Sequence, residues 1–135
     1  MQEQFIPYEQ AVELKELGFD EQCFAYFSKS IEEDPEFGLD LDIDETNNSN
    51  LSDISNRNVS FISAPLWQQA FEFISKKYNY FGNIISVCSY KTSTFYFDIK
   101  MHGFYWSTLD SVLFSSYEEA RLECLKKLIE IVKNK

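Results

Sequence analysis

The chain has 135 residues and a formal net charge of −10, with 44% hydrophobic and 17% aromatic residues. This length fits one domain with a modest core, and the apolar content excludes global disorder. No apolar run approaches the roughly 20 residues of a membrane helix, and the start Met1-Gln2-Glu3-Gln4 lacks the regions of a signal peptide, so we expect a cytoplasmic protein.

The N-terminal segment, residues 1–29, predicts one helix and one strand. Residues 8–17 carry a short apolar face typical of a helix, with Pro7 suited to its first turn and Gly18 to its C-terminal cap. Residues 23–27 are apolar at both alternating positions, which predicts a strand covered on both faces.

The acidic charge is concentrated in the first half of the chain. Residues 1–63 hold 15 acids and three bases, whereas residues 64–135 hold seven acids and nine bases. Self-repulsion and low hydrophobicity predict an acidic, mobile insertion over residues 30–60. The alternation of leucine or isoleucine with aspartate over residues 39–44 allows a short edge strand or a docking segment. Its candidate partner-binding residues are Asp40, Asp42, Asp44 and Glu45.

The same stretch falls short of a calcium-binding loop. Counting from Asp42, Asn47 stands where the loop glycine belongs and Asp53 where the bidentate glutamate belongs. We therefore expect no metal there.

The C-terminal part, residues 61–135, predicts the order helix, strand, strand, strand, helix. An amphipathic pattern predicts the first helix from Pro65 to about Lys77. Strands are expected over residues 83–89, 95–102 and 104–108, with Gly103 in the last turn. A capping box with Ser115 at the cap and Glu118 three residues later opens a helix that runs to about residue 133.

These elements predict an α+β fold. Helices should pack on one face of a small antiparallel sheet, with the C-terminal α-β-β-β-α unit preceded by an α-β segment in one compact domain. The aromatic-rich sheet offers Tyr96, Tyr105 and Trp106 as hydrophobic anchors for a partner.

The rare residues argue against several chemistries. The cysteines Cys23, Cys88 and Cys124 are scattered and there is one histidine, which leaves too few ligands for a zinc site. The four glycines are isolated, so no loop is suited to a phosphate or a dinucleotide cofactor. Asp98 and His102 form the only acid–base pair, and on one strand they lie about 13 Å apart. We expect neither an enzyme nor a cofactor.

Residues 64–133 resemble the double-stranded RNA-binding domain in the order and size of their elements. That family opens its second helix with Ser-Lys-Lys-x-Ala-Lys, whose lysines meet phosphates. The matching stretch here is Ser116-Tyr117-Glu118-Glu119-Ala120-Arg121, in which Tyr117 and Glu118 replace the two lysines. The loop at residues 90–93 also lacks the family's Gly-Pro-x-His. The resemblance implies the fold, and its departures argue against the usual ligand because phosphate contacts need cations.

A second resemblance covers most of the chain outside the acidic segment. The phrases Phe5-Ile6-Pro7-Tyr8, Ala64-Pro65-Leu66-Trp67-Gln68-Gln69-Ala70-Phe71 and Ser116-Tyr117-Glu118-Glu119-Ala120 are similar to small uncharacterised proteins of Bacteroidota and their phages. This likeness implies a phage or mobile-element setting and no mechanism.

Together these features favour a non-enzymatic accessory protein that acts by protein–protein interaction. Its acidic segment would meet a basic surface of a host or phage protein, and inhibition of a host protein is one way it would act. The alternatives are a tolerated, solvated acidic insertion without a function, and a nucleic-acid-binding module in the C-terminal half. That module would use lysines and Arg121 as a basic patch, with Tyr96, Tyr105 and Trp106 as stacking surfaces.

Overall fold

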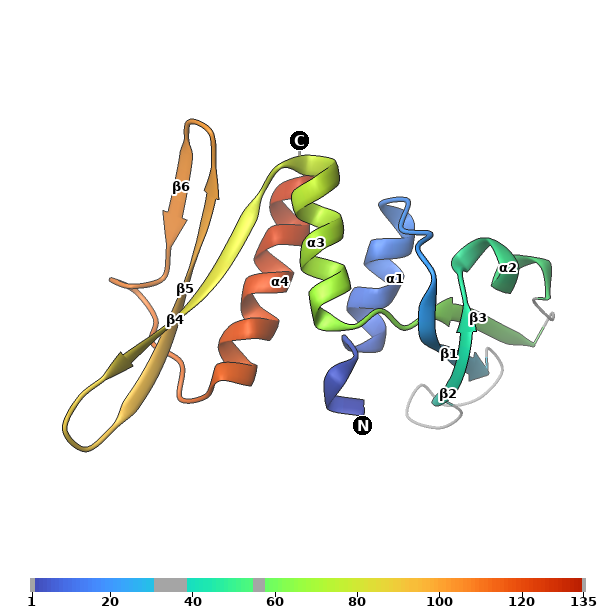
Figure 1. The fold of residues 1–135 in the computed structure, drawn as a ribbon, viewed down its shortest axis with the longest axis horizontal. Helices are drawn as coiled ribbons and strands as arrows, with labels where there is room; N and C mark the ends of the chain where they lie inside the picture. The colour runs from blue at the N-terminus through green and yellow to red at the C-terminus, as the bar shows by residue number, and fades with distance from the viewer. Residues whose placement is uncertain (1, 31–38, 55–57, 135) are drawn as a thin grey trace. The chain divides into compact units, whose positions relative to one another are not determined.

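A computed structural model describes residues 2–30, 39–54 and 58–134. Its helices and its two three-stranded antiparallel sheets confirm the predicted α+β class (Figure 1). The sequence predicted only the sheet in the C-terminal half, and the structure has an additional sheet in the N-terminal half.

Contacts divide the chain into two compact units, Met1–Ala70 and Phe71–Lys135, where the sequence predicted one compact domain. The first unit contains a 3-10 helix η1 (Gln2–Gln4), helices α1 (Tyr8–Glu16) and α2 (Asn48–Asp53), and strands β1 (Cys23–Ser30), β2 (Leu39–Thr46) and β3 (Val59–Ser63). The boundary falls within helix α3 (Trp67–Tyr78). The second unit adds strands β4 (Phe81–Cys88), β5 (Ser93–Met101) and β6 (Phe104–Ser107), and helix α4 (Tyr117–Lys133).

The end of α1 is set by a Schellman motif at the predicted glycine. Gly18 has φ +94°, a conformation that favours glycine, and its N–H donates to the carbonyl of Lys15 at 3.0 Å. The N–H of Phe19 donates to the carbonyl of Leu14 at 2.9 Å. Both Leu14 and Phe19 are buried, so the turn also supplies core residues.

The first sheet has the order β2-β1-β3, with both pairings antiparallel. Phe27 of β1 pairs with Leu41 of β2 and Ile62 of β3, and α1 packs against β3. The core of this unit is made of buried apolar side chains that include Phe5, Ile6, Ala11, Leu14, Phe19, Ala25, Phe27, Leu51 and Ile62.

The acidic insertion predicted over residues 30–60 needs correction. Within it the structure places β2, α2 and the first residues of β3, while residues 31–38 and 55–57 lie outside the described residues. Asn47 caps α2, because its side chain accepts a hydrogen bond from the N–H of Asn50 at 2.8 Å. The acidic composition of the segment did not indicate helix α2, which is capped by Asn47 and packs into the unit through the buried side chain of Leu51.

The second sheet has the order β4-β5-β6, and α3 and α4 lie on the same side of it (Figure 1). Helix α4 contacts β4 and β5. It approaches β4 so closely at Gly82 that there is no room for a side chain at this position. A Cβ on Gly82 would lie 2.7 Å from Sγ of Cys124. The buried face of α4 comprises Ala120, Cys124, Leu125, Leu128, Ile129 and Val132, and burial of each large aliphatic side chain contributes about 1.5–3 kcal/mol.

The cap of α4 lies one residue later than predicted. Ser116, not Ser115, is the N-cap, and its hydroxyl accepts a hydrogen bond from the N–H of Glu119 at 3.1 Å. Ser115 instead donates to the carboxylate of Glu119 at 3.1 Å. The tandem Ser-Ser and Glu-Glu pairs satisfy the capping spacing in either register, so the sequence alone could not separate them.

Candidate functional site

Strand β2 carries the four predicted acidic residues at the edge of the first sheet. Asp40 and Asp42 pair with Ser28 and Tyr26 of β1, which places both aspartates on one face. The register shifts between the Cys23–Thr46 and Ala25–Ile43 pairs, so that Asp44 and Glu45 together lie opposite one residue of β1 in a β-bulge. The side chains of all four acidic residues are exposed: Asp40, Asp42, Asp44 and Glu45.

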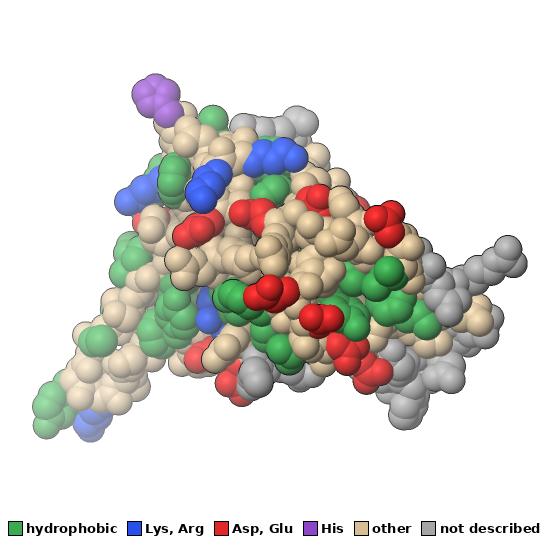
Figure 2. Space-filling model, turned by 45° about the vertical axis from the view of Figure 1, so that its right-hand side comes forward, with side chains coloured by type: hydrophobic (Ala, Val, Ile, Leu, Met, Phe, Trp, Pro, Cys, Tyr) green, Lys and Arg blue, Asp and Glu red, His purple; other side chains and the backbone are tan. Residues whose placement is uncertain are grey.

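In the part of the first unit that the structure describes, one of the four acids has a hydrogen-bond partner. The carboxylate of Glu45 accepts a hydrogen bond from Nε2 of Gln22 at 3.0 Å. Glu45 therefore fixes the end of β2 against the segment before β1, while the three aspartates face solvent. Figure 2 shows acidic side chains (red) next to exposed apolar ones (green) on the face that it draws.

The other face of β2 is apolar. Leu39, Leu41 and Ile43 lie on the same face as the buried residues Ala25 and Phe27 of β1. Leu39 is nevertheless 43% exposed and Ile43 58% exposed. The core therefore ends at β1 and leaves the apolar row of β2 largely uncovered.

The three predicted aromatic anchors do not form one surface. Tyr96 and Tyr105 lie on the face of the second sheet opposite to α4, the face that also carries Asp98. Trp106 follows Tyr105 directly and so points the other way, toward α4, where Nζ of Lys127 lies 4.8 Å from the centre of its ring. Trp106 is thus a packing residue, and Tyr105, at 62% exposed, is free of that role.

A pocket of about 220 Å³ lies between α4 and the end of the second sheet. Phe97, Trp106 and Phe114 line it with aromatic rings, and the ring centres of Phe97 and Phe114 are 5.9 Å apart. Its charged lining residues pair with one another along α4: Lys126 with Glu123 at 3.3 Å, and Lys127 with Glu130 at 3.4 Å. This balance gives the pocket no preference for one sign of charge.

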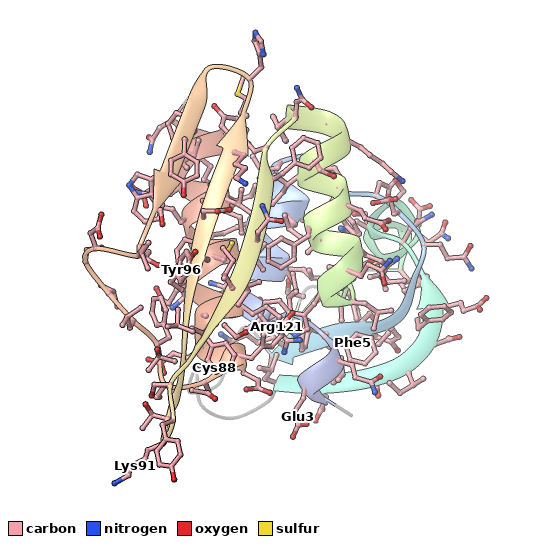
Figure 3. The ribbon with its side chains drawn as sticks, turned by 60° about the vertical axis from the view of Figure 1, so that its left-hand side comes forward. Glu3, Phe5, Cys88, Lys91, Tyr96 and Arg121 are labelled. Atoms are coloured by element: carbon pink, nitrogen blue, oxygen red, sulfur yellow. The ribbon has the colours of Figure 1, made fainter. Side chains whose placement is uncertain are left out.

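The β4–β5 hairpin ends in a closed tip. The N–H of Ser89 donates to the carbonyl of Thr92 at 2.8 Å, and their hydroxyl oxygens lie 2.8 Å apart. Tyr90 is 98% exposed, and Figure 3 shows Lys91 at the tip, pointing away from α3 and α4. The sequence indicated this loop in two ways, by the motif that it lacks and by Lys91 as a member of the candidate basic patch.

Asp98 and His102, the only acid–base pair that the sequence offered, were expected to lie too far apart for a hydrogen bond. Asp98 is 5% exposed, accepts a hydrogen bond from Nδ2 of Asn83 at 3.1 Å, and lies 3.9 Å from Nζ of Lys100. His102 is exposed beside the turn at Gly103. The carboxylate is therefore held by an amide and an ammonium group.

Two of the three thiols are poorly suited to nucleophilic chemistry. Burial, with the charge of Glu21 as a smaller cause, raises the pKa of Cys23 to about 12. Burial, with the charge of Asp98 as a smaller cause, likewise raises the pKa of Cys124 to about 12. Both thiols stay protonated at neutral pH, whereas Cys88 is exposed.

The predicted basic patch is largely engaged in local contacts. Lys76 pairs with Glu72 and Lys100 with Asp98, each at 3.9 Å, and the lysines of α4 pair as described above. Arg121 lies over the ring of Tyr117 at 5.6 Å. Most of the cations that would meet phosphates therefore already lie next to carboxylates or aromatic rings, whereas Lys91 is exposed at the hairpin tip.

No family model, no curated protein and no solved structure matches this chain. Among the described residues, no helix has the length and apolar character needed to cross a membrane. In the same residues, no group of three or more His, Cys, Asp and Glu side chains is placed to hold a metal ion.

Proposed function

We propose that the protein is a non-enzymatic binding protein whose partner presents a basic protein surface. The observation that carries this proposal is the exposed row of Asp40, Asp42 and Asp44 on edge strand β2. Exposed carboxylates that follow one another along a strand create a local negative potential that steers and selects a positively charged partner.

The distribution of charge favours protein over nucleic acid as the partner. A polyanion would be repelled by the acidic first unit, and in the second unit α4 begins with Glu118 and Glu119. The ion pairs of Lys76, Lys100 and Lys126 would have to be broken to release cations for phosphates.

In a phage or mobile-element setting, the partner would be a host protein. A basic surface that normally contacts nucleic acid would be occupied by the acidic strand, so that binding and inhibition would be the same event. A role without catalysis also fits the thiols of Cys23 and Cys124, which burial keeps protonated by raising the pKa of each to about 12.

The test is affinity capture from a host lysate with three immobilised proteins. The first is the wild type, and the second is the variant Asp40→Asn, Asp42→Asn, Asp44→Asn. The third is a matched control that changes the charge equally at other exposed acids of the first unit: Glu9→Gln, Glu21→Gln, Asp53→Asn.

We expect the wild type and the control to retain a protein that elutes as the salt concentration rises, and the strand variant to lose it. Circular dichroism would verify that all three are folded. Equal capture by all three proteins, or a captured partner that nuclease treatment removes, would contradict the proposal.

A further inference from the structure

Strand β2 is the edge of its sheet over a regular stretch of five residues. Leu39 to Ile43 pair in an unbroken register with Lys29 to Ala25 of β1, and the bulge begins only beyond Ile43. Among the described strands, β1 is the only one that pairs with β2. Alternate backbone N–H and C=O groups of this stretch therefore point outward, where another strand could pair with them.

The edge is protected by the charge of its aspartates and by a bulge at one end, and its backbone is not blocked along residues 39–43. Proteins commonly block an exposed strand with lysine, proline or a central bulge. The stretch has neither lysine nor proline, its bulge lies at one end, and it exposes the apolar side chains of Leu39 and Ile43. An added strand would cover these side chains as well as satisfy the backbone.

The acidic row limits which strand can be added. If two copies of this chain paired antiparallel through β2, their aspartates would lie on the same face of the joint sheet, about 5 Å apart. Like charges at that distance destabilise the pair, so the edge disfavours a second copy of itself. The favoured strand has lysine or arginine on the face of Asp40 and Asp42, and aliphatic residues on the face of Leu39 and Ile43.

We infer that β2 binds its partner by strand addition, taking an extended segment with alternating basic and aliphatic residues as a fourth strand of the sheet. The inference rests on the proposed function and specifies how the partner is held. Main-chain hydrogen bonds would supply affinity, and the two faces of the added strand would supply specificity.

The experiment uses the full chain and a fluorescent probe, an eight-residue peptide of alternating lysine and valine with blocked ends. Two further peptides carry N-methyl groups on backbone amide nitrogens. One is methylated at the amide of every lysine residue, and the other at the amide of every valine residue. All three have the same charge. An added strand turns only one of the two sets of N–H groups toward β2.

Fluorescence anisotropy should show saturable binding of the unmodified peptide and of one methylated peptide. The other methylated peptide should bind about tenfold more weakly or worse, because its donors to β2 are lost and its methyl groups clash. The variant Ile43→Ser should weaken binding several-fold, and the variant Asp40→Asn, Asp42→Asn should weaken it and flatten its salt dependence. In the complex, amide protons within residues 39–43 should exchange more slowly.

The outcomes separate the two ideas. Failure of the unmodified peptide to bind, equal binding of all three peptides, or self-association of the wild type through β2 would each overturn strand addition. If the aspartate variant still lost its partner in the capture experiment, the proposed function would stand without strand addition. If capture did not depend on the aspartates, the proposed function itself would fail.

Discussion

The side chain of Asn48 donates a 2.8 Å hydrogen bond from Nδ2 to the carbonyl oxygen of Phe19. Its Oδ1 accepts a second hydrogen bond, at 3.0 Å, from the N–H of Ser63, and the residue is only 5% exposed. One buried amide thus joins the start of α2 to β3 and to the turn that follows α1. The helix after the acidic strand is held in place by a polar contact of long sequence separation.

The first prediction concerns this amide. Asn48→Ala leaves a buried carbonyl and a buried N–H without their partner, each at a cost of about 1–3 kcal/mol. We expect the free energy of unfolding to fall by about 2–4 kcal/mol, measured by urea denaturation. Asn50→Ala, at an exposed position of the same helix, should cost no more than about 0.5 kcal/mol in side-chain contacts. Similar losses from both variants would contradict this role for Asn48.

The second prediction concerns acid stability. Hydrogen bonds from the hydroxyl of Ser49 at 2.5 Å and from its N–H at 2.7 Å lower the pKa of Asp20 from its ordinary value of 3.8. Because the folded state favours the carboxylate, this contribution is fully present above pH 3.8 and is lost as the pH falls through the lower folded pKa. Solvent screening keeps it to about 1 kcal/mol or less.

The variant Asp20→Asn should therefore be less stable than the wild type near pH 6, with a difference that shrinks as the pH falls below 3.8. Urea denaturation at a series of pH values would measure it. Asp53→Asn, on the exposed side of α2, is the control, and a stability difference for Asp20→Asn that grew toward low pH would be inconsistent with the hydrogen bonds to Ser49.

The third prediction concerns the approach of α4 to β4. Gly82→Ala places a Cβ 2.7 Å from Sγ of Cys124 and 3.0 Å from Cδ1 of Leu128, so we expect a loss of about 1–3 kcal/mol in unfolding free energy. Adding Cys124→Ala removes the nearest atom, and the double variant should lose less than the sum of the single ones. Gly103→Asn is the control, because a side chain there meets nothing within 4 Å and asparagine tolerates its positive φ. Strict additivity would argue against the contact.

The fourth prediction concerns the thiols. In the native protein at pH 8, a thiol reagent should label Cys88 rapidly and should label Cys23 and Cys124 only as the protein unfolds. Cys23 and Cys124 are slow to react because the reagent does not reach their buried thiols and because the pKa of each thiol is about 12. Mass spectrometry of the labelled protein would count the modified sites, and Cys88→Ser should abolish the fast reaction. Rapid labelling of all three thiols without denaturant would refute the burial.

The fifth prediction separates two neighbouring aromatic residues. Trp106→Ala removes contacts with the ring of Phe97, 5.5 Å away, and with Lys127, and should cost about 2 kcal/mol in unfolding free energy. Tyr105→Ala, on the opposite face, should cost no more than about 0.5 kcal/mol. Thermal unfolding of both variants would measure the difference, and the reverse ranking would show that the two faces are wrongly assigned.

Where hydrophobic periodicity and capping residues agree, sequence reasoning located the elements well. The amphipathic pattern after Pro65 gave α3, and the alternation of residues 95–102 gave β5, each within about two residues. The period of an element is imposed by its own geometry, so it can be read locally. The alternation over residues 39–44 allowed either an edge strand or a docking segment, and the structure has strand β2 there, with Asp40 and Asp42 paired to β1.

What sequence reasoning missed depends on distant contacts. Helix α2 has six residues and little apolar surface. It is held by hydrogen bonds of Asn48 to Phe19 and of Ser49 to Asp20, each pair 29 positions apart in the chain. Strand β3 alternates Val59, Phe61 and Ser63 with Ser60 and Ile62, but its partners in β1 lie from 29 (Ser30 and Val59) to 37 (Tyr26 and Ser63) residues earlier. The charge pattern of the segment did not reveal α2 or β3. It indicates how well a segment is solvated on average, and it contains no information on which distant residues the segment contacts. The capping asparagine at Asn47 was the one local signal.

The self-contained tip of the β4–β5 hairpin also has a practical use. The hydrogen bonds between Ser89 and Thr92 close the turn without help from the side chain of Tyr90. A fluorophore or an affinity tag attached at position 90 would therefore leave the register of the strands intact. Because β2 belongs to the other unit, such a label leaves the residues of β2 unchanged and suits a test of the proposed binding.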